Sequence, residues 1–154
     1  MQLTRFTDYT LRVLIAVGVS KNRNATIGGI SAQYGISKNH LMKVVQQLGR
    51  RGYLETVRGK GGGLRLAVPA EEINLGKVVR EVEGGFHLVP CFDPSRPDQC
   101  TITPSCVLKG ALGRALGAFL DVLDGYTLAD LIVPDRRLRN LLAAGPRNVR
   151  EARA

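Results

Sequence analysis

The sequence has no apolar segment long enough to cross a bilayer. Its longest apolar run, residues 13–19, is far shorter than the roughly 20 residues that a membrane-spanning helix needs. The first ten residues, MQLTRFTDYT, contain neither an apolar signal-peptide core nor a cleavage pattern. These absences predict a cytoplasmic protein with no membrane partner.

The sequence also lacks the residues expected of an enzyme. It has two histidines, His40 and His87, and neither lies near a plausible nucleophile or acid–base partner. The glycine-rich run at 59–63 does not have the order GxxxxGK[ST] of a phosphate-binding loop, and it precedes a predicted strand rather than a helix. No cysteine is marked as an activated thiolate. We therefore predict no catalytic site.

Positive charge is confined to one half of the chain. The net charge is +9, and residues 1–80 account for all of it with 13 Lys/Arg and 4 Asp/Glu, whereas residues 81–154 hold 9 of each. A solvated basic surface alone would give such a count. A basic half beside a neutral half also suggests that one end of the molecule faces a polyanion.

The basic half has the pattern of a helix-turn-helix. Helices are expected at about 7–20, 27–34 and 38–51, and Gly35 lies in the short turn between the second and the third. Apolar residues recur at helical spacing on one face of the third helix, at Leu41, Val44, Val45 and Leu48. This face is predicted to enter the core, which leaves the opposite face free to meet a ligand.

A β-hairpin is predicted directly after these helices. Strands at 53–57 and 64–68 flank the glycine-rich run, as in a winged helix-turn-helix, where the last helix enters the major groove and the hairpin touches the DNA backbone or minor groove. Asn and Gln bond adenine edges, Lys contacts guanine or phosphate, and glycine allows close backbone approach. The predicted DNA-binding residues are Lys38, Asn39, His40, Lys43, Gln46, Arg58, Lys60 and Gly61.

The second half predicts a helix, a loop and a long helix. A helix at 73–83 precedes an irregular loop, and apolar residues of the helix at 107–124 then follow heptad spacing. This spacing predicts a dimer seam. We expect a winged helix-turn-helix domain at 1–83, a cysteine loop at 84–106, a dimerisation helix with a C-terminal helical segment at 107–142, and a disordered tail at 143–154. The fold class is mainly α with a small β-hairpin wing.

Three cysteines fall within the loop in the pattern C-x8-C-x5-C: Cys91, Cys100 and Cys106. An odd number of clustered cysteines favours metal or cluster ligation over a disulfide framework. An iron–sulfur cluster, zinc and redox-active thiols all remain open, although the gaps are wider than structural zinc usually uses. A fourth ligand is then needed, and the candidates are His87, Asp93, Asp98 and the remote Asp8.

These motifs together resemble the iron–sulfur winged-helix transcription regulators that include IscR and NsrR, over nearly the full length to about residue 140. The resemblance rests on MQLTRFTDYTLRVL, on ISKNHLMKVVQQLGRRGYLETVRGKGGGLRL, and on the cysteine loop before a long helix. It is greatest with the nitric-oxide-sensing branch. It implies a homodimer on palindromic operator DNA, with a cluster held by Cys91, Cys100, Cys106 and by Asp8 of the other subunit.

The resemblance also bears on the kind of cluster. Family members that bind 2Fe–2S carry a histidine three residues after the last cysteine, and this sequence has Lys109 there. An oxygen-ligated 4Fe–4S cluster is therefore preferred over 2Fe–2S. A carboxylate is a weaker partner for iron than a thiolate is, so the iron bound to Asp8 is the expected point of attack for nitric oxide. Arg12, one turn further along, is expected to pair with Asp8 when no cluster is bound.

The function that follows is a nitric-oxide-sensing repressor, which leaves operator DNA when its cluster is nitrosylated. An IscR-type regulator that responds to iron–sulfur or redox status is the alternative. A small electron carrier with a basic docking face is a third reading, and the recognition-helix pattern speaks against it.

Overall fold

The first three helices each begin at a hydroxyl side chain. The computed structural model describes residues 2–20, 25–59, 61–95 and 100–146, and it opens with α1 (Arg5–Val19), α2 (Ile27–Tyr34) and α3 (Lys38–Arg50). Hydroxyl side chains cap all three helices by accepting a hydrogen bond from a backbone N–H three residues later: Thr4, Thr26 and Ser37. Such caps stabilise a helix because its first N–H groups have no partner within the helix.

The apolar face predicted for α3 lies in the core. Leu41, Val44 and Leu48 are 0% exposed, and Val45 packs against the same cluster. Val13 and Leu14 of α1 are equally buried. The packing of α1 against α3 therefore fixes which face of α3 remains outside.

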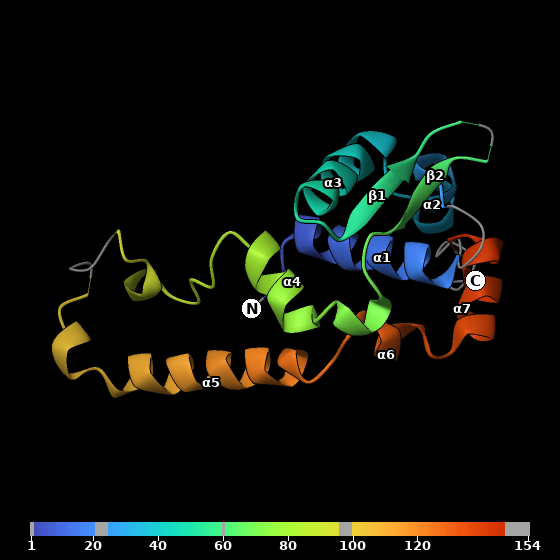
Figure 1. Ribbon diagram of the computed structural model, residues 1–154. Coiled ribbons are helices and arrows are strands. Elements are labelled where there is room, and N and C mark those ends of the chain that lie inside the picture. The colour runs from blue at the N-terminus through green and yellow to red at the C-terminus, as the bar shows by residue number, and fades with distance from the viewer. Residues whose placement is uncertain (1, 21–24, 60, 96–99, 147–154) are drawn as a thin grey trace, which may run out of the picture.

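The predicted wing forms a two-stranded antiparallel hairpin. Strands β1 (Leu54–Val57) and β2 (Gly63–Leu66) pair with Leu54 opposite Leu66. Each strand is slightly shorter than the sequence predicts. Figure 1 shows α3 and the hairpin on the side of the head that lies away from α5 (Val107–Asp124). The mainly helical winged fold predicted from the sequence is thus confirmed.

A short helix connects the head to the cysteine segment. One 3-10 turn, η1 (Ala70–Glu72), leads into α4 (Leu75–Val82), which is shorter than the predicted helix at 73–83. The segment that follows contains two further turns, η2 (Pro90–Phe92) and η3 (Thr103–Ser105). This segment and the far end of α5 lie away from the head (Figure 1).

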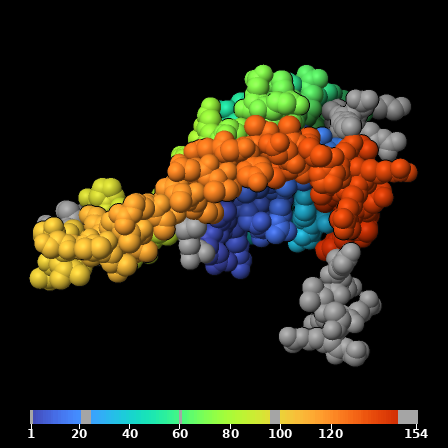
Figure 2. Space-filling model, turned by 90° about the horizontal axis from the view of Figure 1, so that it is seen from below, coloured from blue at the N-terminus to red at the C-terminus, as the bar shows by residue number. Residues whose placement is uncertain are grey.

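Helix α5 projects from the head as an arm, which the space-filling view in Figure 2 shows in orange. None of its residues is buried, although its sequence is strongly apolar. Leu108 and Val122, two of the predicted heptad positions, are each 62% exposed. In the described part of the chain, no helix combines the length and the apolar character that crossing a membrane would require.

After α5 the chain returns to the head. Helices α6 (Leu128–Ile132) and α7 (Asp135–Ala144) pack against α1, and α7 also contacts α2. Leu128 is 0% exposed and belongs to the main core cluster. The sequence predicted a helical segment up to residue 142 and a disordered tail from residue 143, whereas α7 continues to Ala144. Residues 147–154 of that tail lie outside the described residues.

Candidate metal centre and nucleic-acid interface

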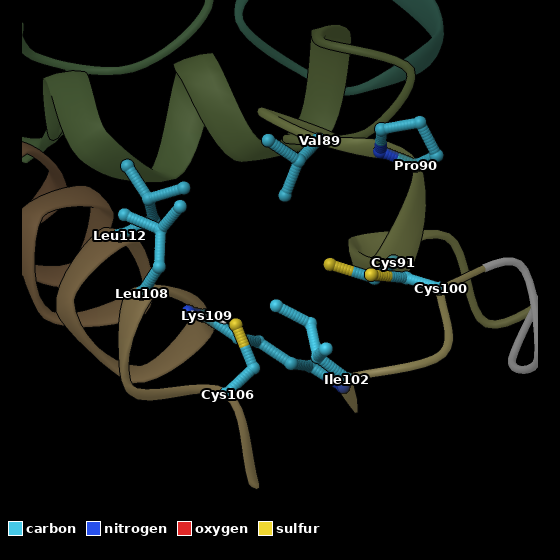
Figure 3. Close-up of a pocket in the computed structure, with 9 residues that line it drawn as sticks. All are labelled: Val89, Pro90, Cys91, Cys100, Ile102, Cys106, Leu108, Lys109 and Leu112. Atoms are coloured by element: carbon cyan, nitrogen blue, oxygen red, sulfur yellow. Dashed lines mark hydrogen bonds between the residues drawn. The ribbon is translucent and has the colours of Figure 1, made fainter. Parts of the chain in front are cut away.

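The three cysteines line one hollow beside the start of α5. Its volume is about 310 Å³, and the sulfur atoms of all three face it (Figure 3). Its other lining residues are mostly apolar, and they come from the cysteine segment and the start of α5: Val89, Pro90, Ile102, Leu108, Lys109 and Leu112. The cysteines predicted as ligands are therefore brought to one site, although the first and the last are 15 residues apart in sequence.

Two of the cysteines are placed by local structural features. Cys91 lies within η2, and Cys106 is the N-cap of α5. The backbone N–H of Lys109 donates to Sγ of Cys106 at 3.4 Å, which orients this sulfur toward the hollow. Cys100 is exposed, while the other two are partly buried. All three are free of disulfides.

The hollow suits an iron–sulfur cluster chemically. Thiolates are the usual ligands of such clusters, and an apolar surround limits solvent access. Within the described residues of this one chain, no group of three or more His, Cys, Asp or Glu side chains is arranged to hold a metal ion. The donors that line the hollow are three thiol groups, Cys91, Cys100 and Cys106, and no His, Asp or Glu side chain lines it with them.

Two of the local candidates for a fourth ligand lie at a neighbouring hollow. His87 and Asp93 line it together with Cys91. The carboxylate of Asp93 accepts from Oγ of Ser95 at 2.7 Å and from its backbone N at 2.9 Å, and these bonds lower the pKa of Asp93 below its ordinary value. Asp93 thus stabilises a turn. Asp98, the third local candidate, lies outside the described residues.

Asp8 lies in the first turn of α1 and pairs with Arg12 in this chain. Nε of Arg12 is 2.9 Å from Oδ1 of Asp8, as expected from the sequence. The Arg12 guanidinium also lies 5.6 Å from the ring centre of Tyr34, at the end of α2. Burial raises the pKa of Tyr34, and the charge of Arg12 partly opposes that rise. Arg12 therefore contacts both Asp8 and the last residue before the helix-turn-helix turn.

The start of α1 is also bound to the end of α4, a contact that the sequence analysis missed. Glu83 accepts hydrogen bonds from the backbone N of Thr4, at 3.1 Å, and from the hydroxyl groups of Thr4 and Thr7. Residues nearly 80 positions apart make this contact, so no local pattern could have indicated it. Glu83 places the turn that carries Asp8 beside the start of the cysteine segment.

The predicted recognition residues of α3 form an exposed surface. Lys38, Asn39, Lys43 and Gln46 are all exposed, opposite the buried face of the helix. His40 is exposed as well, but its ring lies 6.0 Å from that of Tyr9 on α1, and its Nδ1 is 3.1 Å from Oγ of Ser37. His40 therefore contacts the start of α1 as well as solvent.

The wing presents the other predicted contacts. Arg58 follows β1 and is exposed. Gly61 has φ of 84°, a left-handed conformation that glycine adopts without strain. Lys60 lies outside the described residues. Arg65, on the same hairpin, forms an ion pair with Glu55 of the facing strand, with its Nε 2.6 Å from Oε1 of Glu55.

The chain matches a family of transcription regulators over most of its length. The model of the Rrf2 family, described as "Iron-dependent Transcriptional regulator", matches residues 3–134. This chain belongs to the Rrf2 family of transcription regulators.

Individual relatives agree with this assignment. The chain is 50% identical over 145 residues to the HTH-type transcriptional regulator NsrR of Bacillus licheniformis, covering 93% of this chain and 100% of the relative. It is 49% identical to NsrR of Bacillus subtilis, with 92% and 97% covered. Both relatives carry the name NsrR, one of the two names in the resemblance that the sequence motifs indicated.

Solved structures share the fold. The oxidized form of Staphylococcus aureus CymR superposes with a TM-score of 0.68 at 28% identity, and the match covers 86% of this chain and 97% of that one. IscR of T. potens has a TM-score of 0.69 at 22% identity, with 86% of each chain covered. The resemblance to IscR supports the fold alone.

Proposed function

We propose that this protein is a cytoplasmic, nitric-oxide-sensing repressor that binds palindromic operator DNA as a homodimer and carries an iron–sulfur cluster. The observation that carries the proposal is the hollow that the three cysteine sulfurs face (Figure 3), beside the start of helix α5, which projects from a basic winged-helix head. Nitric oxide is chosen as the signal because the sequence motifs most resemble the nitric-oxide-sensing branch of these regulators. Relatives that are about half identical to this chain carry the name NsrR.

Cys91, Cys100 and Cys106 would hold the cluster, with Asp8 of the other subunit as the fourth ligand. Lys109 occupies the position where a histidine would favour 2Fe–2S, so the 4Fe–4S form is preferred. When bound, the cluster would supply iron that nitric oxide attacks, most readily where the ligand is oxygen. The remaining steps belong to the protein's own residues.

Dimerisation is supported by the exposed apolar surface of α5. Helix α5 has 18 residues, many of them apolar, and none of them is buried. Leaving such an apolar surface in contact with water is energetically unfavourable. Leu108, Leu112, Ala115, Phe119 and Val122 follow the spacing of a helix–helix seam. Pairing of two such arms would also place the cysteine segment of one subunit against the second copy.

Asp8 would transmit the signal through α1. While Asp8 bonds to the cysteine site of the other subunit, it holds the first turn of α1, which Glu83 also anchors. Once released, the Asp8 carboxylate takes the Arg12 guanidinium, the pairing seen in this chain. Arg12 lies over Tyr34, and α1 packs against α3. A change at Asp8 would therefore shift the two recognition helices relative to operator half-sites about one DNA turn apart.

The test is operator binding by protein purified without oxygen, measured before and after addition of nitric oxide. We expect iron and sulfide in the protein, tight binding beforehand and weak binding afterwards. The variant Cys106→Ser should lose iron and the response, whereas its neighbour Ser105→Ala should keep both. Operator affinity that nitric oxide leaves unchanged would reject the proposed signal.

An IscR-type response to iron–sulfur or redox status is the second candidate, and the description of the family as iron-dependent favours it. It predicts that removal of the cluster alone, without nitric oxide, switches operator choice or restores binding. Mössbauer spectra of the anaerobic protein would distinguish 2Fe–2S from 4Fe–4S and so separate the two candidates.

A further inference from the structure

One large apolar side chain of the head is strongly exposed. Met42, on α3, is 50% exposed. In the part of the chain that the structure describes, the other large apolar side chains with a similar degree of exposure all lie between the cysteine segment and α7: Ile102, Val107, Leu108, Val122, Tyr126, Val133 and Leu141. The proposed dimer seam would cover those on α5, whereas Met42 lies on α3, on the opposite side of the head.

Met42 lies on the recognition face. Asn39 precedes it by three residues and Gln46 follows it by four, which places all three on one side of a helix. The buried residues Leu41, Val44 and Leu48 occupy the opposite side. Met42 therefore cannot turn into the core.

The surroundings of Met42 favour DNA over a protein as its partner. Its exposed neighbours on α3 are polar or cationic, namely Lys38, Asn39, Lys43, Gln46 and Arg50. A protein-docking patch has a continuous apolar centre, and a single methionine does not provide one. The DNA major groove, in contrast, offers isolated thymine methyl groups among polar base edges and phosphates.

We propose that Met42 contacts the 5-methyl group of a thymine in each operator half-site and so contributes to sequence preference. The inference rests on the proposed function, because it takes α3 as the recognition helix. Asn39 and Gln46 are the side-chain types that bond adenine edges. With Met42 between them, the exposed face of α3 suits a run of A·T pairs. The flexible thioether side chain can adapt to the position of the methyl group.

The experiment replaces each thymine by deoxyuridine, which removes only the methyl group. The operator is first selected by the wild-type protein from a random duplex library, and substitutions are then made at one symmetric pair of positions at a time. At one symmetric pair of positions, we expect the substitution to weaken wild-type binding by about fourfold per half-site. This is the effect expected when one methyl-sized contact is lost to water. Met42→Ala should bind both duplexes equally, and Met42→Leu should retain part of the preference.

The matched control is Lys43→Ala, the next residue on the same surface. It should weaken binding to both duplexes and leave the thymine-to-uracil ratio at its wild-type value. Operator binding whose uracil penalty is the same in wild type and Met42→Ala would overturn the inference while leaving the proposed function intact. Absence of any sequence-selective binding by the wild-type protein would overturn both.

Discussion

Replacing Arg58 by alanine should make operator binding less sensitive to salt. Arg58 follows β1 at the tip of the wing and is exposed, and the adjacent Gly59, with φ of 94°, turns the chain there. On a duplex bound through α3, this position would meet a phosphate. Each phosphate contact releases condensed counterions and contributes about −0.9 to the slope of log affinity against log salt concentration.

In the proposed homodimer the effect would be doubled. Two wings on a palindromic operator would lose two phosphate contacts, so the slope should become less steep by about 1.8 units. The change should be the same on specific and on random duplexes, because phosphates carry no sequence information. Fluorescence anisotropy with a labelled operator, repeated at several salt concentrations, measures the slope directly.

Arg65 provides the matched control on the same hairpin. Its guanidinium faces Glu55 across the strands, with Nε 2.6 Å from Oε1, so its charge is already compensated within the protein. Arg65→Ala should therefore leave the slope close to that of the wild type. Equal slopes for the wild type and Arg58→Ala, or equal losses for the two variants, would refute the assignment of Arg58 to the DNA backbone.

Three further predictions concern other parts of the molecule. Leu128→Ala should lower the free energy of unfolding by about 3 kcal/mol, because α6 places this 0% exposed side chain in the core of the head; urea unfolding with a loss under about 1 kcal/mol would contradict this. Burial, and to a smaller extent the hydrogen bond to Glu81, raises the pKa of Tyr53 from 10.0 to about 12. The protonated phenol therefore stabilises the fold fully below pH 10, and this contribution is lost as the pH rises through about 12. Tyr53→Phe should accordingly lose less stability than the wild type over this range, and alkaline unfolding curves that run parallel would exclude the effect. Val122→Asp, at a 62% exposed position of α5, should convert a dimer to a monomer in sedimentation equilibrium, and a dimer that persists would remove the proposed seam.

Elements with a strong local period could be predicted from the sequence. The face of α3 is an example, since Leu41, Val44 and Leu48 recur at helical spacing and are the residues that the core takes up. The hairpin could be predicted equally well, because a glycine-rich run separates two short stretches of residues that favour β-strands. Helix α1 begins at Arg5, slightly earlier than expected, because Thr4 rather than a later residue provides its cap.

Long-range contacts could not be predicted in the same way. The bonds between Glu83 and the start of α1 join segments that the sequence places far apart, and only the packing of α4 brings them together. A helical segment was predicted up to residue 142, but the packing of α6 and α7 on the head was not, because α7 is rich in arginine and its sequence does not show which surface it contacts. Its apolar residues still suffice for one side to pack against α1 and α2.

Part of the candidate site could be predicted from the sequence, because its cysteines lie close together in the chain. The spacing of the three cysteines indicated one ligand group, and they line one hollow. A fourth ligand could not be assigned from spacing, because Asp8 lies on another element and pairs with Arg12 within its own chain. Its role as a ligand stays a prediction that depends on the second subunit.

The most direct test of the account compares anaerobic wild-type protein with Asp8→Ala in operator binding, before and after nitric oxide, with the visible spectrum recorded on the same samples. We predict an altered spectrum for Asp8→Ala and an operator affinity that is low and unaffected by the gas. A variant that keeps both the wild-type spectrum and the wild-type loss of binding on exposure to nitric oxide would contradict the claim that Asp8 links the cysteine site to the DNA-binding head.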